Sequence, residues 1–326
     1  MGAAEPWNLA VALLAAGAVV VLAALATRVS RRGPIPLALL FLFVGILAGS
    51  EGLGGLYFDD HVLAYRIGTI ALVLILFDGG ISTRFDRVRR HLRPAIVLAT
   101  FGVFATAAVL GAAGRLLGLS WTEALLLAAV VSSTDAAAVF SVLRGSGINL
   151  QQRLSATIEM ESGLNDPMAV ILTVAMAELA LTGSLTLSSL AWQVPVQLAV
   201  GTLVGVGVGI GCREALVRLP PAAAGLFPVV TAASAAISYG AATVAWGSGF
   251  LAVYVCGLVL GNRPLPDRNG LRRVHDFLAW SSQVALFLTL GLLVFPSQLV
   301  DVAPVALALT AVLVFVARPI AVALCL

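Results

Sequence analysis

Long apolar runs follow one another along almost the whole chain, separated by short polar or Pro/Gly-rich breaks. Of the 326 residues, 60% are hydrophobic and only 11% are charged, a composition far from that of a soluble domain. A helix needs about 20 apolar residues to cross a bilayer, so the fold class is predicted as an all-α polytopic membrane protein. The expected spans are 7–27, 34–50, 62–82, 94–118, 121–143, 153–181, 190–217, 224–246, 248–262, 276–298 and 302–326.

The arginines indicate the orientation of these spans. The chain has no lysine, and sixteen of its nineteen arginines follow odd-numbered spans. Short cytoplasmic loops are enriched in basic residues, which predicts an N-terminus on the outside of the cell membrane. Glu5 before the first run and Arg28 after it favour a retained span over a signal peptide. The basic balance therefore reflects inner loops and does not indicate a nucleic-acid partner.

The cysteines and histidines give no sign of a metal site or a cofactor. Cys212, Cys256 and Cys325 lie in or beside apolar spans without ligand-like spacing, so no disulfide or metal centre is expected. The three histidines, at positions 61, 91 and 275, fall in loops or at span edges, where we expect solvated side chains.

The chain resembles itself at an offset of 212 residues. FVGILAG (43–49) matches VCGLVLG (255–261), and the same offset places Gly79 over Gly291, although chance matches are an alternative in so glycine-rich a chain. A shift of seven spans inverts the orientation, and inverted repeats are typical of secondary transporters. Asp135 shifted by this offset falls beyond Leu326. The second repeat is therefore expected to be incomplete, with the transporter truncated before its second crossing helix.

Six ionisable residues fall well inside predicted spans. A charge at the centre of a membrane helix costs about 2.5 to 3.5 kcal/mol on insertion scales, so such groups face a cavity or one another. They either hold the bundle together as structural pairs or line an ion path, and their number favours the second alternative. The six are Asp78, Asp135, Glu159, Glu161, Asp166 and Arg318.

Helical spacing sorts the polar residues of ESGLNDP (161–167). Ser162 and Asp166 are four residues apart and share a helix face, while Glu161 and Asn165 share the adjacent face. A hydroxyl and a carboxylate on one face are an oxygen set suited to an alkali cation. On the other face, Glu161 is a natural partner for Arg318.

The stretch SSTDAAA (132–138) predicts a helix interruption. Ser and Thr side chains bond to local backbone and loosen a helix, so the chain is expected to unwind around Asp135, a bent helix being the alternative. Glu159 is expected to be solvated near the inner end of its span.

Two long motifs resemble the monovalent cation:proton antiporters of the NhaP-like type, in particular their potassium/proton branch. These are SSTDAAAVFSVLR in the fifth span and IEMESGLNDPMAVILT in the sixth, and FVGILAG, LILFDGG and VARPIAV match in the same order. The resemblance implies one transport domain over 1–326, built as inverted repeats with interrupted helices that cross at an ion site. It implies ion-site core helices at 62–181 and scaffold helices, which form a homodimer, at 1–50 and 190–262.

The resemblance also implies roles for individual residues. Asp166 would be the essential carboxylate for cation and proton, and Glu161 with Arg318 would be a buried ion pair tied to the site by Asn165. The implied binding set is Asp166, Asp135, Thr134, Ser162 and Asp78, and the supporting set is Glu161, Arg318 and Asn165.

Asn165, where electrogenic relatives have a second aspartate, implies electroneutral exchange. Ala136, where many sodium-type members have proline, favours potassium, and sodium is the alternative. A cation channel is a further alternative, which would not need obligatory proton coupling. An intramembrane aspartyl protease using Asp135 and Asp166 would require a GxGD-type helix, which the sequence lacks, so no enzymatic activity is expected. The expected partners are potassium or sodium ions, protons and membrane lipid.

Overall fold

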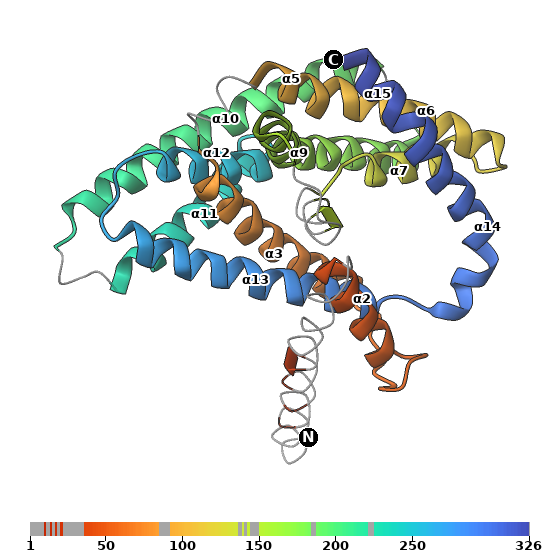
Figure 1. The fold of residues 1–326 in the computed structure, drawn as a ribbon, viewed down its shortest axis with the longest axis horizontal. Helices are drawn as coiled ribbons and strands as arrows, with labels where there is room; N and C mark the ends of the chain where they lie inside the picture. Colours follow the sequence, from red (N-terminus) through yellow and green to blue (C-terminus); the bar gives the residue numbers. More distant parts are fainter. Residues whose placement is uncertain are drawn as a thin grey trace. The chain divides into compact units, whose positions relative to one another are not determined.

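The computed structural model describes residues 36–84, 92–135, 150–183, 187–220 and 225–325, together with a few isolated residues between 10 and 21 and between 139 and 143. In this part of the chain the only extended pairing is one bridge between Gly49 and Leu56, so the all-α fold is confirmed. The helices (Figure 1) are α2 (Leu37–Ala48), α3 (His61–Ser82), α5 (Leu92–Val97), η1 (Leu98–Gly102), α6 (Val103–Leu116), α7 (Trp121–Val131), α9 (Gln152–Thr182), α10 (Leu187–Arg218), α11 (Phe227–Val244), α12 (Gly249–Gly261), α13 (Arg268–Leu292), α14 (Pro296–Val312), η3 (Leu313–Ala317) and α15 (Arg318–Cys325).

The helices are those of a multi-pass membrane protein. Among the described residues, six helical stretches are long and apolar enough to span a bilayer, and three more apolar helices are shorter. On the stretch Pro296–Cys325, large apolar side chains such as Leu307 and Phe315 are exposed, as lipid-facing residues are. Most of the first predicted span, 7–27, lies outside the described residues.

The predicted starts of the last two spans are wrong. The span expected at 276–298 is α13, which begins at Arg268 and ends at Leu292. The arginine-rich segment before the apolar run is itself helical, and Asp267 Oδ1 accepts a hydrogen bond from the Gly270 amide at 3.2 Å, as an N-cap does. The next helix, α14, begins at Pro296, since proline suits the first turn of a helix.

Two long helices contain a π-helical segment. The first, η1, separates α5 from α6, and the second, η3, separates α14 from α15. A π segment inserts a residue into the helical register and so turns every later side chain to a new direction. Because η3 ends at Ala317, it sets the direction of Arg318. The helix that follows, α15, packs on η1.

The chain divides into two compact units. One contains Met1–Ala71, Ala137–Asn149 and Trp280–Val302, and the other contains Leu72–Ala136, Leu150–Ala279 and Ala303–Leu326. The second unit has two main hydrophobic clusters. Cluster A joins α3, α10, α11, α12 and α13 through residues such as Phe77, Leu216 and Val253, and cluster B joins α6, α7, α9 and α14 through residues such as Leu110 and Met168.

Glycines at matched positions of the repeat make matched contacts. In the first unit, Gly45 of α2 lies against the backbone of Gly291 in α13. In the second unit, Gly257 of α12 lies against the backbone of Gly80 in α3. The offset of 212 places Gly45 over Gly257, and Gly291 over Gly79, the neighbour of Gly80. The same close helix contact thus occurs twice, which supports the inverted repeat.

The expectation of solvated histidines is wrong for His275. This side chain is 1% exposed, its Nε2 lies 2.7 Å from Thr231 Oγ1, and its ring meets the Phe77 ring edge to face with 5.0 Å between centroids. The early start of α13 places His275 inside the helix, facing α3 and α11. His61 is exposed beside Asp59, and His91 lies outside the described residues.

Two adjacent glycines of α3 allow a matched test of the close contact with α12. A Cβ on Gly80 would collide with the Tyr254 carbonyl, whereas a Cβ on Gly79 would have nothing within 4 Å. We predict that Gly80→Ala lowers the stability by about 1 to 3 kcal/mol, as overpacking does. The melting temperature in detergent should fall for Gly80→Ala and not for Gly79→Ala. Equal melting temperatures for the two variants would contradict the close contact between Gly80 and α12.

A carboxylate in the first unit predicts a pH-dependent stability. Glu51 accepts hydrogen bonds from the Ser297 backbone amide at 2.7 Å and the Ser297 hydroxyl at 2.5 Å, which hold the pKa of Glu51 below its ordinary value of 4.5. A lowered pKa stabilises the fold at higher pH, and this contribution is lost as pH falls through the folded-state pKa. Glu51→Gln should therefore lower the melting temperature at pH 7, and its difference from the native protein should close in acid. Asp301→Asn, on an exposed position of α14, is the control, and a difference independent of pH would disprove the assignment.

Candidate functional site

The predicted interruption of the fifth span is present. Helix α7 begins at a capping box, in which Ser120 and Glu123 bond each other's backbone amides, and ends at Val131. Ser132 is buried, and its hydroxyl donates to the Ala129 carbonyl at 2.8 Å. The chain from Ser133 to Asp135 is not helical. The hydroxyl therefore competes for the last helical carbonyls, as expected for serine near a helix end.

The unwound segment bonds directly to α9. Ser133 Oγ lies 2.6 Å from Asp166 Oδ1 and 2.9 Å from Asn165 Oδ1. Asn165 is fully buried. Its amide nitrogen faces Glu161 Oε1 at 2.9 Å and Thr134 Oγ1 at 3.1 Å, so its oxygen must face Ser133. These contacts join the polar residues of the fifth and sixth spans into one network.

A buried ion pair completes this network. Arg318 Nη2 lies 3.2 Å from Glu161 Oε1, with side-chain exposures of 20% and 9%. Thr134 Oγ1 also donates to Glu161, at 3.1 Å and 3.3 Å from its two oxygens. Glu161 thus receives bonds from α15, from α9 and from the unwound segment. We call these six residues the polar cluster: Ser133, Thr134, Glu161, Asn165, Asp166 and Arg318.

The remaining predicted site residues lie in other settings. Ser162 is buried on α9 and Asp135 is exposed. Asp78 is half-buried on α3, where the charged groups that act on it most are Asp276 and Arg272 of α13. The side chain of Glu159 lies outside the described residues.

Ser133 is the cluster residue that the sequence did not single out. Helical spacing placed Ser162 on the same face as Asp166, and the structure adds the hydroxyl of Ser133, from the unwound segment, bonded to Asp166. The sequence feature that could have pointed to Ser133 is the run of three hydroxyl side chains, Ser132 to Thr134, before Asp135. In an unwound segment, however, periodicity does not determine which hydroxyl faces α9.

The cluster brings carboxylate, hydroxyl and amide oxygens together at a helix break. Carboxylate, hydroxyl and carbonyl oxygens replace the hydration shell of alkali cations in membrane proteins. Among the residues that the structure describes, no group of three or more His, Cys, Asp or Glu is arranged to hold a metal ion. Within the cluster, the Asp166 carboxylate lies beside a charge pair whose two charges already compensate each other.

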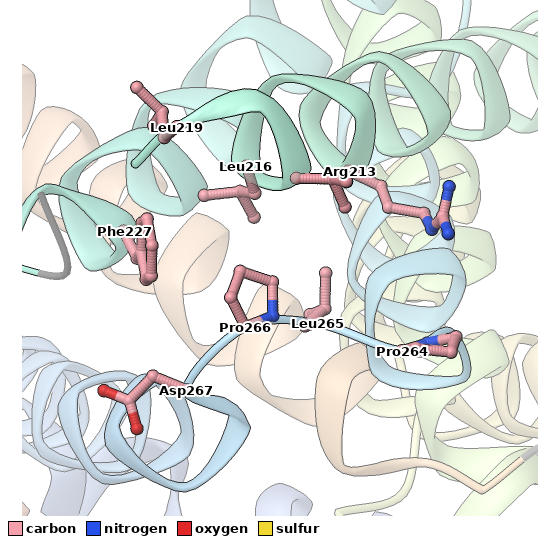
Figure 2. Close-up of a pocket in the computed structure, with 9 residues that line it drawn as sticks. Arg213, Leu216, Leu219, Phe227, Pro264, Leu265, Pro266 and Asp267 are labelled. Carbon is pink, nitrogen blue, oxygen red and sulfur yellow. The ribbon is translucent and has the colours of Figure 1, made fainter. Parts of the chain in front are cut away.

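A separate cavity of about 530 Å³ lies where α10 ends (Figure 2). Apolar side chains form most of its wall, Arg213 and Asp267 lie at opposite ends, and no residue of the polar cluster lines it. It is therefore unsuited to a dehydrated cation. The lining residues are Arg213, Leu216, Val217, Leu219, Phe227, Pro264, Leu265, Pro266 and Asp267.

The family model of the sodium/hydrogen exchanger transmembrane region matches residues 17–326. The chain belongs to this exchanger family. The resemblance to NhaP-like antiporters is confirmed as well. The chain is 46% identical over 319 residues to the K(+)/H(+) antiporter NhaP of Alkalimonas amylolytica, covering 96% of this chain and 55% of that one.

Other relatives agree in family and fold. The K(+)/H(+) antiporter NhaP2 of Shewanella sp. (strain ANA-3) is 43% identical over 314 residues, and the match covers 95% of this chain and 53% of that relative. The chain thus spans about half the length of these relatives. The structure of the sodium proton antiporter MjNhaP1 from Methanocaldococcus jannaschii at pH 8 has the same fold, with a TM-score of 0.82, 22% identity and coverage of 97% and 78% of the two chains.

The ion pair predicts a strong and specific destabilisation. Arg318→Gln leaves the Glu161 charge buried without its counter-ion, which costs about 3 to 5 kcal/mol. The double variant Glu161→Gln/Arg318→Gln should be more stable than Arg318→Gln alone, because it buries no unpaired charge. Unfolding of the purified variants in detergent measures both effects.

The pair Arg213–Glu214 is the matched control, with side-chain exposures of 26% and 45%. Because Glu214 is far more exposed to water than Glu161, Arg213→Gln should cost less stability than Arg318→Gln. If Arg318→Gln is equally mild, the Glu161–Arg318 pair does not stabilise the fold.

Proposed function

We propose that this exchanger chain carries the ion site of a secondary active transporter that exchanges a monovalent cation, with potassium favoured, for a proton. The single observation that carries the proposal is the Asp166 carboxylate, held at 2.6 Å by Ser133 in a helix break beside the Glu161–Arg318 pair. Because the charges of Glu161 and Arg318 compensate each other, Asp166 is left to bind the transported ion.

Competition at Asp166 is the proposed coupling. A proton and a cation each neutralise the same carboxylate, so only one is bound at a time. Asn165 donates and accepts hydrogen bonds but does not ionise, so the site exchanges one proton for one cation and the transport is electroneutral. The binding set further includes Asp135, Thr134, Ser162 and Asp78, with Glu161, Arg318 and Asn165 in support.

The hydroxyl of Ser133 offers a physical link between the two bound states. It has one hydrogen but two acceptors in reach, Asp166 at 2.6 Å and Asn165 at 2.9 Å. When Asp166 is ionised, Ser133 donates to it in a charge-assisted bond. When Asp166 is protonated, its own O–H donates to Ser133, and the serine hydrogen turns to Asn165. The Ser133 hydroxyl thus keeps a bond to Asp166 in both states, and only its hydrogen changes acceptor.

Potassium is favoured over sodium by two observations. The relatives at 46% and 43% identity are named K(+)/H(+) antiporters, and position 136 is alanine rather than proline. The alternative, sodium, is supported by the 28% identical Na(+)/H(+) antiporter NhaS2 of Synechocystis sp. (strain ATCC 27184 / PCC 6803 / Kazusa). Ala136 lies outside the described residues.

The wider arrangement is part of the proposal. We infer an ion-site core at 62–181 and scaffold helices at 1–50 and 190–262 that form a homodimer, in a bacterial inner membrane with the N-terminus outside. Cluster B, which joins α6, α7 and α9, supports the core, although α3 packs in cluster A with the scaffold helices.

Exchange assays on the full-length protein in everted vesicles test the function. With a proton gradient established, potassium should collapse the gradient more effectively than sodium, and Asp166→Asn should abolish the response because its side chain cannot exchange a proton. In proteoliposomes the exchange rate should not depend on an imposed membrane potential.

Ser133→Ala and Ser133→Thr refine the assignment. The alanine variant loses the hydrogen bond to Asp166 and should shift the pH dependence of exchange, whereas threonine retains a hydroxyl and should shift it less. A wild-type response from Asp166→Asn would show that the carboxylate is structural. Cation flux without proton movement would favour a channel.

A further inference from the structure

The helix α9 is weakened at the turn that carries the polar cluster. Pro167 lies inside α9 and has no backbone N–H, so the carbonyl of Gly163, four residues earlier, lacks its ordinary helical donor. The proline ring also crowds that carbonyl. Asn165 and Asp166 lie within this turn. Their positions therefore depend on a part of α9 that lacks one of its backbone hydrogen bonds.

Tyr254 of α12 contacts α9 at this turn. A Cβ on Gly163 would lie 2.9 Å from Cε2, Cζ and Oη of Tyr254, closer than real Cβ contacts. The Tyr254 side chain is buried, with 2% of the residue exposed. The hydroxyl end of the ring thus rests on the bare backbone of Gly163, and only glycine fits there while the ring stays in place.

The ring of Tyr254 is in turn held by α3. Its Oη lies 3.4 Å from Thr83 Oγ1, and Thr83 Oγ1 lies 2.7 Å from the Gly79 carbonyl. Threonine has one hydroxyl hydrogen and a carbonyl can only accept, so Thr83 donates to Gly79 and Tyr254 donates to Thr83. The Thr83 carbonyl accepts a hydrogen bond from Asn262 Nδ2 at 2.8 Å, which fixes the end of α3 to the end of α12.

The backbone of Tyr254 also contacts α3. Its carbonyl lies against Gly80, where a Cβ would collide with it. Helices α3 and α12 belong to cluster A, whereas α9 belongs to cluster B. Tyr254 therefore reaches from one hydrophobic cluster to the weakened turn of the other.

We propose that Tyr254 is a positioning residue that braces the Gly163–Pro167 turn of α9 against α3 and α12, and so sets where Asp166 meets Ser133. This inference rests on the proposed exchange at Asp166. Tyr254 acts through α9 and not through contact with the transported ion. The absence of a side chain at Gly163 is what allows the brace to reach the helix backbone.

Space-compensating variants of the full-length protein in proteoliposomes test the proposal. Gly163→Ala forces α9 away from the ring and should raise the KM for potassium about 10- to 100-fold, the effect of a displacement near 1 Å. Tyr254→Leu removes the ring and should also raise KM. The double variant has room for the new methyl group, and its KM should recover by about threefold or more relative to Gly163→Ala, as coupled neighbours do.

Two controls separate positioning from general damage. Tyr254→Phe keeps the ring on Gly163 and loses the hydroxyl that bonds Thr83, so its KM should stay closer to wild type than that of Tyr254→Leu. Gly240→Ala, on a helical glycine of α11 with nothing within 4 Å of its Cβ, should leave KM unchanged. A fall in maximal rate at constant KM in the Gly163 and Tyr254 variants would overturn positioning, since that is the signature of less folded protein.

Melting temperatures in detergent provide a readout that does not need transport, measured on the wild type, Gly163→Ala, Tyr254→Leu and the double variant. If the ring contacts Gly163, the double variant should melt at a higher temperature than Gly163→Ala. If the wild-type protein exchanges no ion but the melting temperatures show the recovery, the brace stands and the proposed function fails. If the wild-type protein exchanges potassium and the double variant is no better than Gly163→Ala in either readout, the brace is disproved.

Discussion

A buried carboxylate in a membrane helix is the constraint on which the rest of this structure depends. Removing an ion from water costs several kcal/mol even after relaxation, so Glu161 persists only with full compensation. The compensation comes from three parts of the chain: Arg318 after η3, Thr134 in the unwound segment, and Asn165 one turn along α9. One charged group therefore ties together helices far apart in sequence, and Asp166 is placed as a consequence of that assembly.

The helix break after α7 is tolerated for the same reason. Irregular backbone at membrane depth is stable only where protein or a water-filled cavity satisfies its polar groups. Here the Asn165 amide reaches the Thr134 carbonyl at 3.5 Å, and the hydroxyls of Ser133 and Thr134 turn to α9. The break and the polar residues of α9 thus require each other, which explains why both motifs are rich in polar groups amid apolar sequence.

Sequence reasoning reached the parts of this arrangement that follow from the cost of burial. The spans, the unwinding at SSTD and a partner for Glu161 all follow from the need to satisfy polar groups in lipid. The role of Ser133 did not follow, because helical periodicity does not describe an unwound segment. The π segments were missed because a shift of the helical register leaves no trace where the sequence is almost continuously apolar, as in LVFVA (313–317). The burial of His275 was missed because the arginines at the start of α13 resemble a loop.

The glycine contacts of the repeat have a consequence for how helices associate in lipid. Apolar side chains gain little by leaving lipid for a neighbouring helix, so close packing must supply the association energy. A long side chain would also lose rotamer freedom on packing, whereas glycine has none to lose. The contacts of Gly45 with Gly291 and of Gly257 with Gly80 therefore form at almost no cost in side-chain entropy.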